Sequence, residues 1–471
     1  MLLKYFYDEK VAHASYMVGC QVTNEAVIVD PGRDVDLYLR EAKVQKMRIV
    51  GAVETHIHAD FVSGARELAE RTGATLYVSD EGDVDWKYDY LEEYPHRLLR
   101  DGDCFMIGNV RLETMHTPGH TPEHISFILT DTLGADRPMG IFTGDFVFVG
   151  SAGRPDLLEK AAGVKDTAVA GARQLYQSVQ RFKQLPDYMQ VWPGHGAGSA
   201  CGKGLGAIPS STVGYEKLFN PMLTIEDEAF FIDVLLEGQP EPPKYFAVMK
   251  RVNKEGPTIL GGFAVPEQLS VAQMPALLAA GAMIVDTSAA AAFARAHIPG
   301  TINIPLASLP AWAGWLVDYG KPLYLIVDPA RVGEAVRDLA YIGIDKVAGY
   351  WADTAVDEWR QSGRAVQYYG VIPATEVADR IFKGEMKVVD VRAQTEWDEG
   401  HLPGATHVML GYLAERADEI VDEGKPVVVQ CRTGNRSAIG ASILQAKGAV
   451  EVFNLVDGIR GWAKAGLPIE K

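Results

Sequence analysis

The run Thr55-His56-Ile57-His58-Ala59-Asp60-Phe61 holds the residues of this chain best suited to chemistry. His56, His58 and Asp60 alternate along the run, and on an extended segment alternate side chains point to the same side. Because an apolar stretch precedes the run, we expect it to continue from a strand. Two imidazoles that converge with a carboxylate suit a transition metal. Phe61 cannot bind a metal, which favours one ion over two.

Three later positions would complete a metal site. His120, Asp145 and His195 each stand beside glycine or proline at the expected end of an element, in Pro-Gly-His, Thr-Gly-Asp and Pro-Gly-His runs. Active-site loops concentrate at such positions. His116 and His124 flank the His120 turn outside this pattern, and we expect structural roles for both.

A second reactive group is centred on Cys431. An apolar strand at 426–430 runs directly into Cys431-Arg432-Thr433-Gly434-Asn435-Arg436-Ser437, and an apolar helical segment follows at 438–446. Backbone N–H groups, a helix N-terminus and two arginines around a sulfur favour the thiolate, the nucleophilic form of cysteine. The remaining cysteines show neither zinc-ribbon spacing nor a CxxC pair; they are Cys20, Cys104 and Cys201.

Residues 1 to about 250 must position the histidines, and their pattern predicts a mixed α/β region. Apolar runs bounded by turn residues predict strands at 26–30, 48–54, 124–130, 140–143 and 189–192. Helices are predicted at 34–43 and 163–182.

The rest of the chain contains an internal repeat. Asp286 and His297-Ile298-Pro299-Gly300 recur as Asp390 and His401-Leu402-Pro403-Gly404, a step of 104 residues in both cases. We therefore predict three domains, at 1–252, 258–364 and 367–471. The last two alternate strands with helices, as α/β domains do.

The overall composition limits which classes of partner the protein can bind. A net charge of −17 argues against nucleic acid or an anionic membrane surface. The N-terminus shows no signal-peptide pattern, and no apolar run reaches membrane-spanning length. We expect a cytoplasmic protein that forms a homo-oligomer.

The first domain resembles the metallo-β-lactamase superfamily, through four separated motifs in the family's order. Among its members the persulfide dioxygenases are most similar, since Gly153-Arg154-Pro155-Asp156 matches their Gly-Arg-x-Asp run. The resemblance implies an αββα fold and metal ligands at His56, His120 and Asp145. Two imidazoles and one carboxylate form the facial triad of non-haem Fe(II) oxygenases. One Fe(II) per chain is therefore expected, although these ligand types also accept zinc.

The same resemblance gives supporting roles to other pocket residues. His58, Asp60 and His195 would be remnants of a lost second metal site and would hydrogen-bond around the first. Cys201 would lie in a loop that leaves the pocket, either as a buried small residue or as a carrier of persulfide sulfur. The cations that could bind the organic thiol are open; candidates are Arg154, Lys203 and Lys217.

The last domain resembles rhodanese sulfurtransferases over its full length. By that resemblance Cys431 carries a sulfane sulfur as a persulfide, and the loop from Arg432 to Ser437 cradles it, with Arg436 as the expected anion contact. The first repeat has Val327 or Asp328 at the cysteine position, so this rhodanese-like copy cannot perform thiol chemistry. Its Arg331 is expected to be solvated.

Together the motifs predict oxidation of a small thiol persulfide by O2 to sulfite and thiol, coupled to sulfur transfer among sulfite, thiosulfate and thiols. Such chemistry serves sulfide detoxification. Two alternatives stay open: a zinc thioesterase of the glyoxalase II type, and a sulfur relay whose metal domain is inactive. The sequence leaves undecided which thiol carries the persulfide and in which direction Cys431 transfers sulfur.

Overall fold

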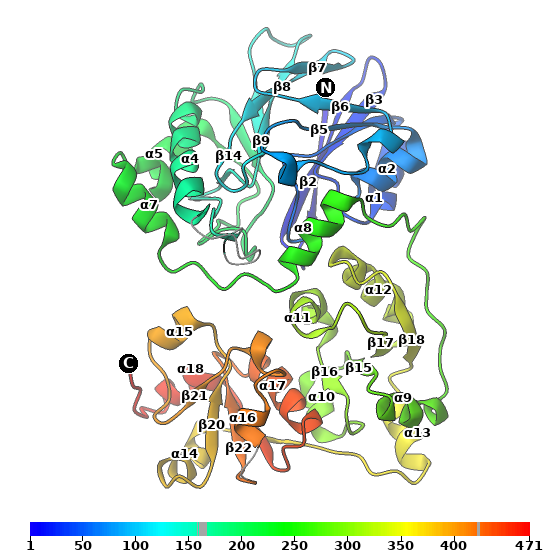
Figure 1. The fold of residues 1–471 in the computed structure, drawn as a ribbon, viewed down its shortest axis with the longest axis vertical. Coiled ribbons are helices and arrows are strands. Elements are labelled where there is room, and N and C mark those ends of the chain that lie inside the picture. Colours follow the sequence, from blue (N-terminus) through cyan, green and yellow to red (C-terminus); the bar gives the residue numbers. More distant parts are fainter. Residues whose placement is uncertain (158, 160–166, 422–423) are drawn as a thin grey trace. The chain divides into compact units, whose positions relative to one another are not determined.

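The computed structural model describes residues 1–157, 159, 167–421 and 424–471, and the chain forms two compact units (Figure 1). The first unit comprises Met1–Gly262 with Ala340–Gly343, and the second comprises Phe263–Leu339 with Ile344–Lys471.

The first unit is built on two six-stranded sheets. One has the order β1-β2-β3-β4-β5-β6 and the other β14-β13-β10-β9-β8-β7. The strands are β1 (Leu2–Asp8), β2 (His13–Cys20), β3 (Glu25–Val29), β4 (Arg48–Val53), β5 (Thr75–Ser79), β6 (His96–Leu99), β7 (Cys104–Ile107), β8 (Val110–His116), β9 (Ile125–Asp131), β10 (Gly140–Gly144), β13 (Gln190–Pro193) and β14 (Ser211–Thr212), with β11 (Val147–Phe148) and β12 (Ser151–Ala152) as a separate pair.

The two sheets enclose one core, and helices cover their outer faces. Along β2, Tyr16 and Val18 point into the core between the sheets, whereas Met17 points to the helices outside, as the two-residue period of a strand requires. Figure 1 shows α1 and α2 on one side of the unit and α4, α5 and α7 on the other. The helices are α1 (Val35–Gln45), α2 (Ala65–Thr72), α4 (Thr167–Phe182), α5 (Val213–Phe219), α6 (Pro221–Thr224), α7 (Glu228–Leu236) and α8 (Phe246–Glu255), with short 3-10 turns η1 (Val84–Trp86) and η2 (Leu91–Glu93). This is the predicted αββα arrangement.

Most predicted elements of this unit are confirmed. The strands expected at 26–30, 48–54, 124–130, 140–143 and 189–192 appear as β3, β4, β9, β10 and β13, with ends that differ by about one residue. The helix expected at 163–182 is α4 from Thr167, and residues 163–166 lie outside the described part. One prediction is wrong: the His56 run does not continue β4, which ends at Val53, but forms a loop of bends.

The second unit repeats one α/β architecture. Its sheets have the orders β16-β15-β17-β18 and β21-β20-β22-β23-β19, and every pairing is parallel. The strands are β15 (Met283–Asp286), β16 (Ile302–Asn303), β17 (Leu323–Ile326), β18 (Val347–Trp351), β19 (Gly370–Ile372), β20 (Lys387–Asp390), β21 (Thr406–His407), β22 (Val427–Gln430) and β23 (Val452–Leu455). Asp286 and Asp390 end equivalent strands, so the sequence repeat is also a structural one.

Helices connect these parallel strands. They are α9 (Met274–Ala279), α10 (Ala290–Arg295), α11 (Leu309–Leu316), α12 (Val332–Tyr341), α13 (Ala355–Gln361), α14 (Ala374–Phe382), α15 (Gln394–Asp398), α16 (Asp418–Val421), α17 (Asn435–Ala446) and α18 (Gly458–Lys464), with 3-10 turns η3 (Val271–Gln273), η4 (Leu306–Ser308), η5 (Pro329–Arg331) and η6 (Leu410–Tyr412). Residues 437–445 of α17 are buried throughout, and Ser442 Oγ accepts the Asn303 N–H of β16 at 2.9 Å. This helix therefore joins the two copies. Within the described ranges, no helix has both the length and the apolar composition needed to cross a membrane.

Candidate metal centre and thiol loop

Three predicted residues meet at one edge of the first unit's sheets. His56 lies in the loop after β4, His120 in the turn after β8, and Asp145 directly after β10. Asp145 Oδ2 lies 3.4 Å from His120 Nε2 and 3.9 Å from His56 Nε2. All three residues are buried. Ligand atoms about 2.0–2.2 Å from a common ion stand about 3–4 Å apart, so this spacing fits one metal ion.

Hydrogen bonds fix which ring nitrogen faces the centre. His120 Nδ1 lies 3.0 Å from the Arg154 carbonyl oxygen, which can only accept, so Nδ1 carries the proton. The Thr55 hydroxyl donates to Asp30 and therefore accepts from His56 Nδ1 at 2.9 Å. Each imidazole thus turns an unprotonated Nε2 toward Asp145, the tautomer that a metal requires.

The charges at the centre suit a cation. Burial and neighbouring histidines hold the pKa of His56 well below its usual value, and burial lowers the pKa of His120. Within the described part, His56 Nε2 and both carboxylate oxygens of Asp145 are buried without a hydrogen-bond partner. Buried polar atoms are rarely left unpaired, so this donor set has the chemistry of a metal site.

A second group adjoins the first. His195 Nε2 lies 3.2 Å from Asp60 Oδ2 and 3.4 Å from Asp145 Oδ1, and His195 Nδ1 donates to the Ala12 carbonyl. Cys201 completes this group and is buried, so its loop does not leave the pocket as the sequence had suggested. Burial, with Asp60 and Asp145 nearby, raises the pKa of the Cys201 thiol well above its usual value, which keeps the thiol protonated.

His58 belongs to a third group, with Asp30 and Glu54. Its Nε2 lies 3.2 Å from Asp30 and 3.2 Å from Glu54, and these carboxylates outweigh burial and raise the pKa of His58 well above its usual value. The expectation that His58 shares a side with His56 and Asp60 is therefore wrong, because the segment bends after β4.

Phe61 packs into this histidine cluster. Its ring lies 3.8 Å from that of His13 and 4.4 Å from that of His58, measured between centroids, and it is fully buried. Asn253 of α8 donates to the carbonyls of His58 and Phe61 and so holds the loop in place. His13 and Asn253 belong to no recognisable motif, and no sequence signal pointed to them.

The thiol loop forms as predicted between β22 and α17. Cys431 is buried, and its Sγ accepts the Gly434 N–H at 3.1 Å. The Ser437 hydroxyl lies 3.3 Å from the same sulfur and 2.6 Å from Asn454 Oδ1. Gly434 has a φ of +93°, a conformation that favours glycine. The Gly434 N–H is therefore a donor to this sulfur, while the Ser437 hydroxyl gives its proton to Asn454.

The two loop arginines differ from expectation. Arg436 donates to both carboxylate oxygens of Glu396, and this ion pair raises the pKa of Arg436 against the effect of burial. Arg432, Thr433 and Asn435 are exposed. Arg432, which forms no ion pair with a described residue, is therefore the arginine open to an anion.

Comparison with known proteins identifies the families to which these two sites belong. The metallo-beta-lactamase superfamily profile matches residues 9–195, and the rhodanese-like domain profile matches residues 373–465. A solved metallo-beta-lactamase from Staphylococcus aureus subsp. aureus COL is 42% identical, with a TM-score of 0.68, over 75% of this chain and 99% of that one.

This chain belongs to the metallo-beta-lactamase superfamily. It carries a rhodanese-like domain at its C-terminal end. The persulfide dioxygenase ETHE1 of Bos taurus mitochondria is 29% identical over 49% of this chain and 79% of its own length. A probable zinc-dependent hydrolase of polyketide biosynthesis, BaeB of Bacillus velezensis, is 24% identical over 45% of this chain and 84% of its own length. These relatives indicate an enzyme.

The Gly153–Asp156 segment helps to position the residues of the metallo-beta-lactamase site. Arg154 is fully buried and donates to both carboxylate oxygens of Asp156 at 2.7 Å, while its carbonyl orients His120. A Cβ on Gly153 would lie 1.8 Å from the Asp145 carbonyl oxygen, so only glycine fits there. Arg154 is therefore not available to a thiol ligand.

The other two thiol-binding candidates are also engaged with protein groups. Lys203 donates to the Glu237 carbonyl, and Lys217 pairs with Asp187 and donates to the Leu185 carbonyl. Both ammonium groups thus hydrogen-bond protein oxygens, and a role for either lysine in binding a carrier stays a prediction.

His124 positions the superfamily site, in line with the structural role expected from the sequence. Its Nε2 accepts the Asp145 N–H at 3.1 Å, and its Nδ1 lies 2.8 Å from the Thr117 hydroxyl. His116 lies outside the centre, 2.9 Å from the Pro122 carbonyl oxygen.

The copy without a cysteine has a different pocket. A cavity of about 600 Å³ opens at the ends of β15 and β17, lined by Asp286 and Asp328 among others. Asp390 of the other copy is paired with Arg392, whereas the equivalent Asp286 has Ser288 as its neighbour, and burial raises its pKa. Arg331 is exposed and pairs with Glu334.

Proposed function

We propose that this protein oxidises a small thiol persulfide with O2 at one iron held by His56, His120 and Asp145. The observation that carries the proposal is this donor set of two imidazoles and one carboxylate, with an apolar ring, Phe61, packed among the neighbouring histidines. Two imidazoles and a carboxylate are the ligands of non-haem Fe(II) oxygenases. The ETHE1 relative, named a persulfide dioxygenase, supports the same chemistry.

The net reaction is R–S–SH + O2 + H2O giving R–SH + H2SO3, in which the terminal sulfur is oxidised and O2 is reduced. When bound, the iron would supply open positions where O2 and a soft sulfur meet. The chain excludes water around these positions, since the residues of both groups are buried. His195 Nε2, 3.2 Å from Asp60, is placed to hold the proton that the released thiolate needs.

We further propose that Cys431 transfers sulfane sulfur. A thiolate at Cys431 attacks the outer sulfur of thiosulfate, the S–S bond breaks, and sulfite leaves with the electron pair. The enzyme then holds a cysteine persulfide, which a thiol acceptor discharges. The Gly434 N–H stabilises negative charge on this sulfur, and the exposed Arg432 attracts the anionic donor.

One alternative function also has support, namely a zinc hydrolase that cleaves thioesters. The BaeB relative is named a zinc-dependent hydrolase. In that case the metal would activate water, and a second ion would be expected beside the first. Phe61 argues against the second ion because it offers no ligand atom.

The test is anaerobic loading with Fe(II), followed by O2 uptake with glutathione persulfide as probe. We expect persulfide-dependent uptake that His120→Ala abolishes and that Cys431→Ser retains in its initial phase. Thioester cleavage by the zinc form without any O2 uptake by the iron form would favour the rival. If Cys431→Ser lost O2 uptake, the proposal that the metal centre oxidises the persulfide without Cys431 would be refuted.

A further inference from the structure

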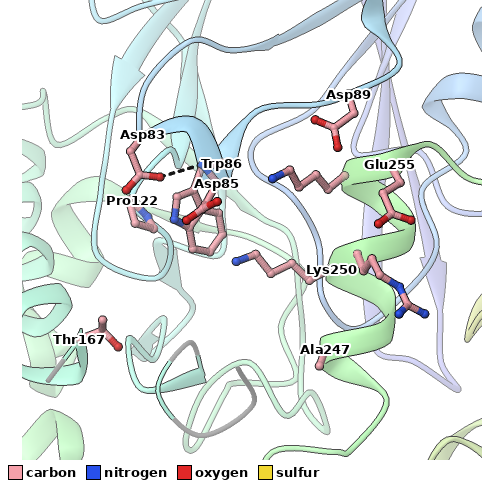
Figure 2. A pocket seen from close by; sticks show the side chains of 11 residues that line it. Asp83, Asp85, Trp86, Asp89, Pro122, Thr167, Ala247, Lys250 and Glu255 are labelled. Atoms are coloured by element: carbon pink, nitrogen blue, oxygen red, sulfur yellow. Dashed lines mark hydrogen bonds between the residues drawn. The ribbon is translucent and has the colours of Figure 1, made fainter. Parts of the chain in front are cut away.

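The cavity of the first unit mixes acids and bases. Figure 2 shows Lys250 and Glu255 of α8 across from Asp83 and Asp85 in this cavity of about 510 Å³. Its charges therefore select no single class of ligand. A second cavity, of about 600 Å³, lies in the copy without a cysteine, and there the copy with Cys431 shows what an equivalent place contains.

The two copies have the same local structure around this second cavity. β15 and β20 each end in an aspartate, and α10 and α15 each begin four residues after it. At the end of each helix an aromatic ring stacks on a histidine. Phe293 lies 4.0 Å from His297, and Trp397 lies 3.6 Å from His401, measured between ring centroids. A residue of the first copy therefore corresponds in position to the residue 104 further along the chain.

In the copy with the cysteine, an arginine fills the space between the strand and the helix. Arg392 donates through Nε and Nη2 to the Asp390 carboxylate, at distances from 2.6 to 3.0 Å. Its Nη1 and Nη2 also donate to the carbonyls of Glu396 and Gly400, at 2.7 and 2.8 Å. Arg392 and Asp390 are both buried. One carboxylate and two carbonyls thus surround a single guanidinium group.

The copy without a cysteine keeps these acceptors but lacks the arginine. Ser288 stands where the other copy has Arg392, while Asp286 is retained. The two carbonyls at this place belong to Ala292 and Ala296. All four residues of this copy line the cavity. The cavity therefore includes the place that a guanidinium group occupies in the other copy.

Asp286 is a buried carboxylate without a cation. It is 2% exposed, and its Oδ1 accepts the Ser288 N–H at 2.8 Å. Among the described residues it forms no ion pair. Burial, with Asp353 nearby, raises the pKa of Asp286, which is the opposite of the effect of a paired cation. Since buried charges are normally paired, a cationic ligand would supply the partner that is missing here.

The other charges of the cavity lie at its exposed rim. The charged residues that line it are Asp286, Asp328, Asp353, Asp357, Arg295, Arg331 and Arg360. All of them except Asp286 are exposed. Arg331 and Arg360 each pair with a carboxylate three residues away in the chain, and Arg295 stands in the last turn of α10 without an ion pair to a described residue. Exposed charges are screened by water and salt, so the buried carboxylate decides which ligand binds.

We propose that this cavity binds a small molecule that carries a guanidinium group, which takes the place of the missing arginine. The planar group would donate to both oxygens of Asp286 and to the carbonyls of Ala292 and Ala296, a pattern that an ammonium group cannot match. The cavity has the volume of a small-molecule site, about 300–1,000 Å³. It also lies at the carboxyl ends of β15 and β17, where the strand order β16-β15-β17-β18 changes direction, the usual ligand position in open α/β sheets.

Binding is measured by calorimetry on the full chain, with n-butylguanidine as the probe. We expect Asp286→Asn to weaken binding at least about tenfold, the effect of losing one hydrogen bond between charged groups. Ser288→Arg should weaken it at least as much, because its own guanidinium fills the place, and should also raise the unfolding temperature by pairing with Asp286. Asp318→Asn removes an exposed carboxylate of the same unit outside the cavity and should leave binding unchanged.

The contradicting results are equally definite. No binding by the wild type, or unchanged binding by Ser288→Arg, would overturn the proposal even if Asp286→Asn failed to fold. Two matched probes test the chemistry: n-butylurea has the shape without the charge, and n-pentylamine has the charge without the planar fork. We expect each to bind at least about tenfold more weakly, and equal binding of either would refute a guanidinium site. A blocked Gly-Arg-Gly peptide that bound more tightly than n-butylguanidine would refute the assignment to a small molecule. Neither proposed activity enters these measurements, so their failure would leave persulfide oxidation and sulfur transfer standing.

Discussion

The hydroxyl of Thr55 offers the sharpest test of the metal centre. It donates to Asp30 at 3.0 Å and accepts from His56 Nδ1 at 2.9 Å. Thr55→Val keeps the shape of the side chain but removes this link, so His56 loses the bond that fixes its tautomer. Loss of such a bond to a ligating histidine weakens metal binding about 10- to 100-fold, or about 1.4–2.7 kcal/mol.

The assay is competition between the protein and a chelator for Fe(II) under anaerobic conditions. Thr114→Val is the matched control, since the Thr114 hydroxyl is buried without a partner in the described part of the chain and its loss should leave the affinity unchanged. If Thr55→Val binds iron as tightly as the wild type, His56 does not ligate through Nε2 and the reasoning fails.

Four other outcomes are expected. Cys431→Ser should abolish thiosulfate–thiol exchange, followed as sulfite release, because Cys431 is the cysteine of the thiol loop; residual exchange above background would contradict this. Phe61→His should raise bound metal from one toward two ions per chain, measured by elemental analysis, and unchanged content would show that the ring does not block a second ion. Burial raises the pKa of Glu123 to about 7, so its contribution to stability is present below about pH 4.5 and lost as the pH rises to 7. Glu123→Gln should therefore gain about 3 kcal/mol over the wild type between pH 4 and pH 8 in urea unfolding, and a pH-independent difference would refute the shift. Asp156→Asn leaves a buried arginine unpaired and should cost about 3–5 kcal/mol in the same assay, against less than about 1 kcal/mol for Asp187→Asn in an exposed pair; equal effects would contradict the buried ion pair.

Much of the architecture could be predicted from the sequence, because the spacing of apolar residues and the turn residues that end each element are local signals. The strands at 26–30, 48–54, 124–130, 140–143 and 189–192 and the 104-residue repeat were predicted in this way from apolar runs, turn residues and spacing. The loop after Val53 was not predictable in the same way, because Asn253 and Asp30 bend it through contacts made far along the chain.

The same distinction between local signals and tertiary contacts applies to the site residues. The resemblance to known families assigned His56, His120 and Asp145 as ligands and Cys431 as nucleophile, and the structure places them in two buried groups of suitable geometry. The pairing of Arg436 with Glu396 and of Arg154 with Asp156 depends on tertiary contacts, so sequence spacing assigned those arginines to ligands instead.

The central claim is one metal ion on two imidazoles and one carboxylate. Anomalous scattering at the iron edge, from crystals of the iron-loaded protein, tests it most directly. The expected result is one peak about 2.0–2.2 Å from His56 Nε2, His120 Nε2 and an Asp145 oxygen. Two bridged peaks, or a single peak between Asp60, His195 and Cys201, would contradict the account.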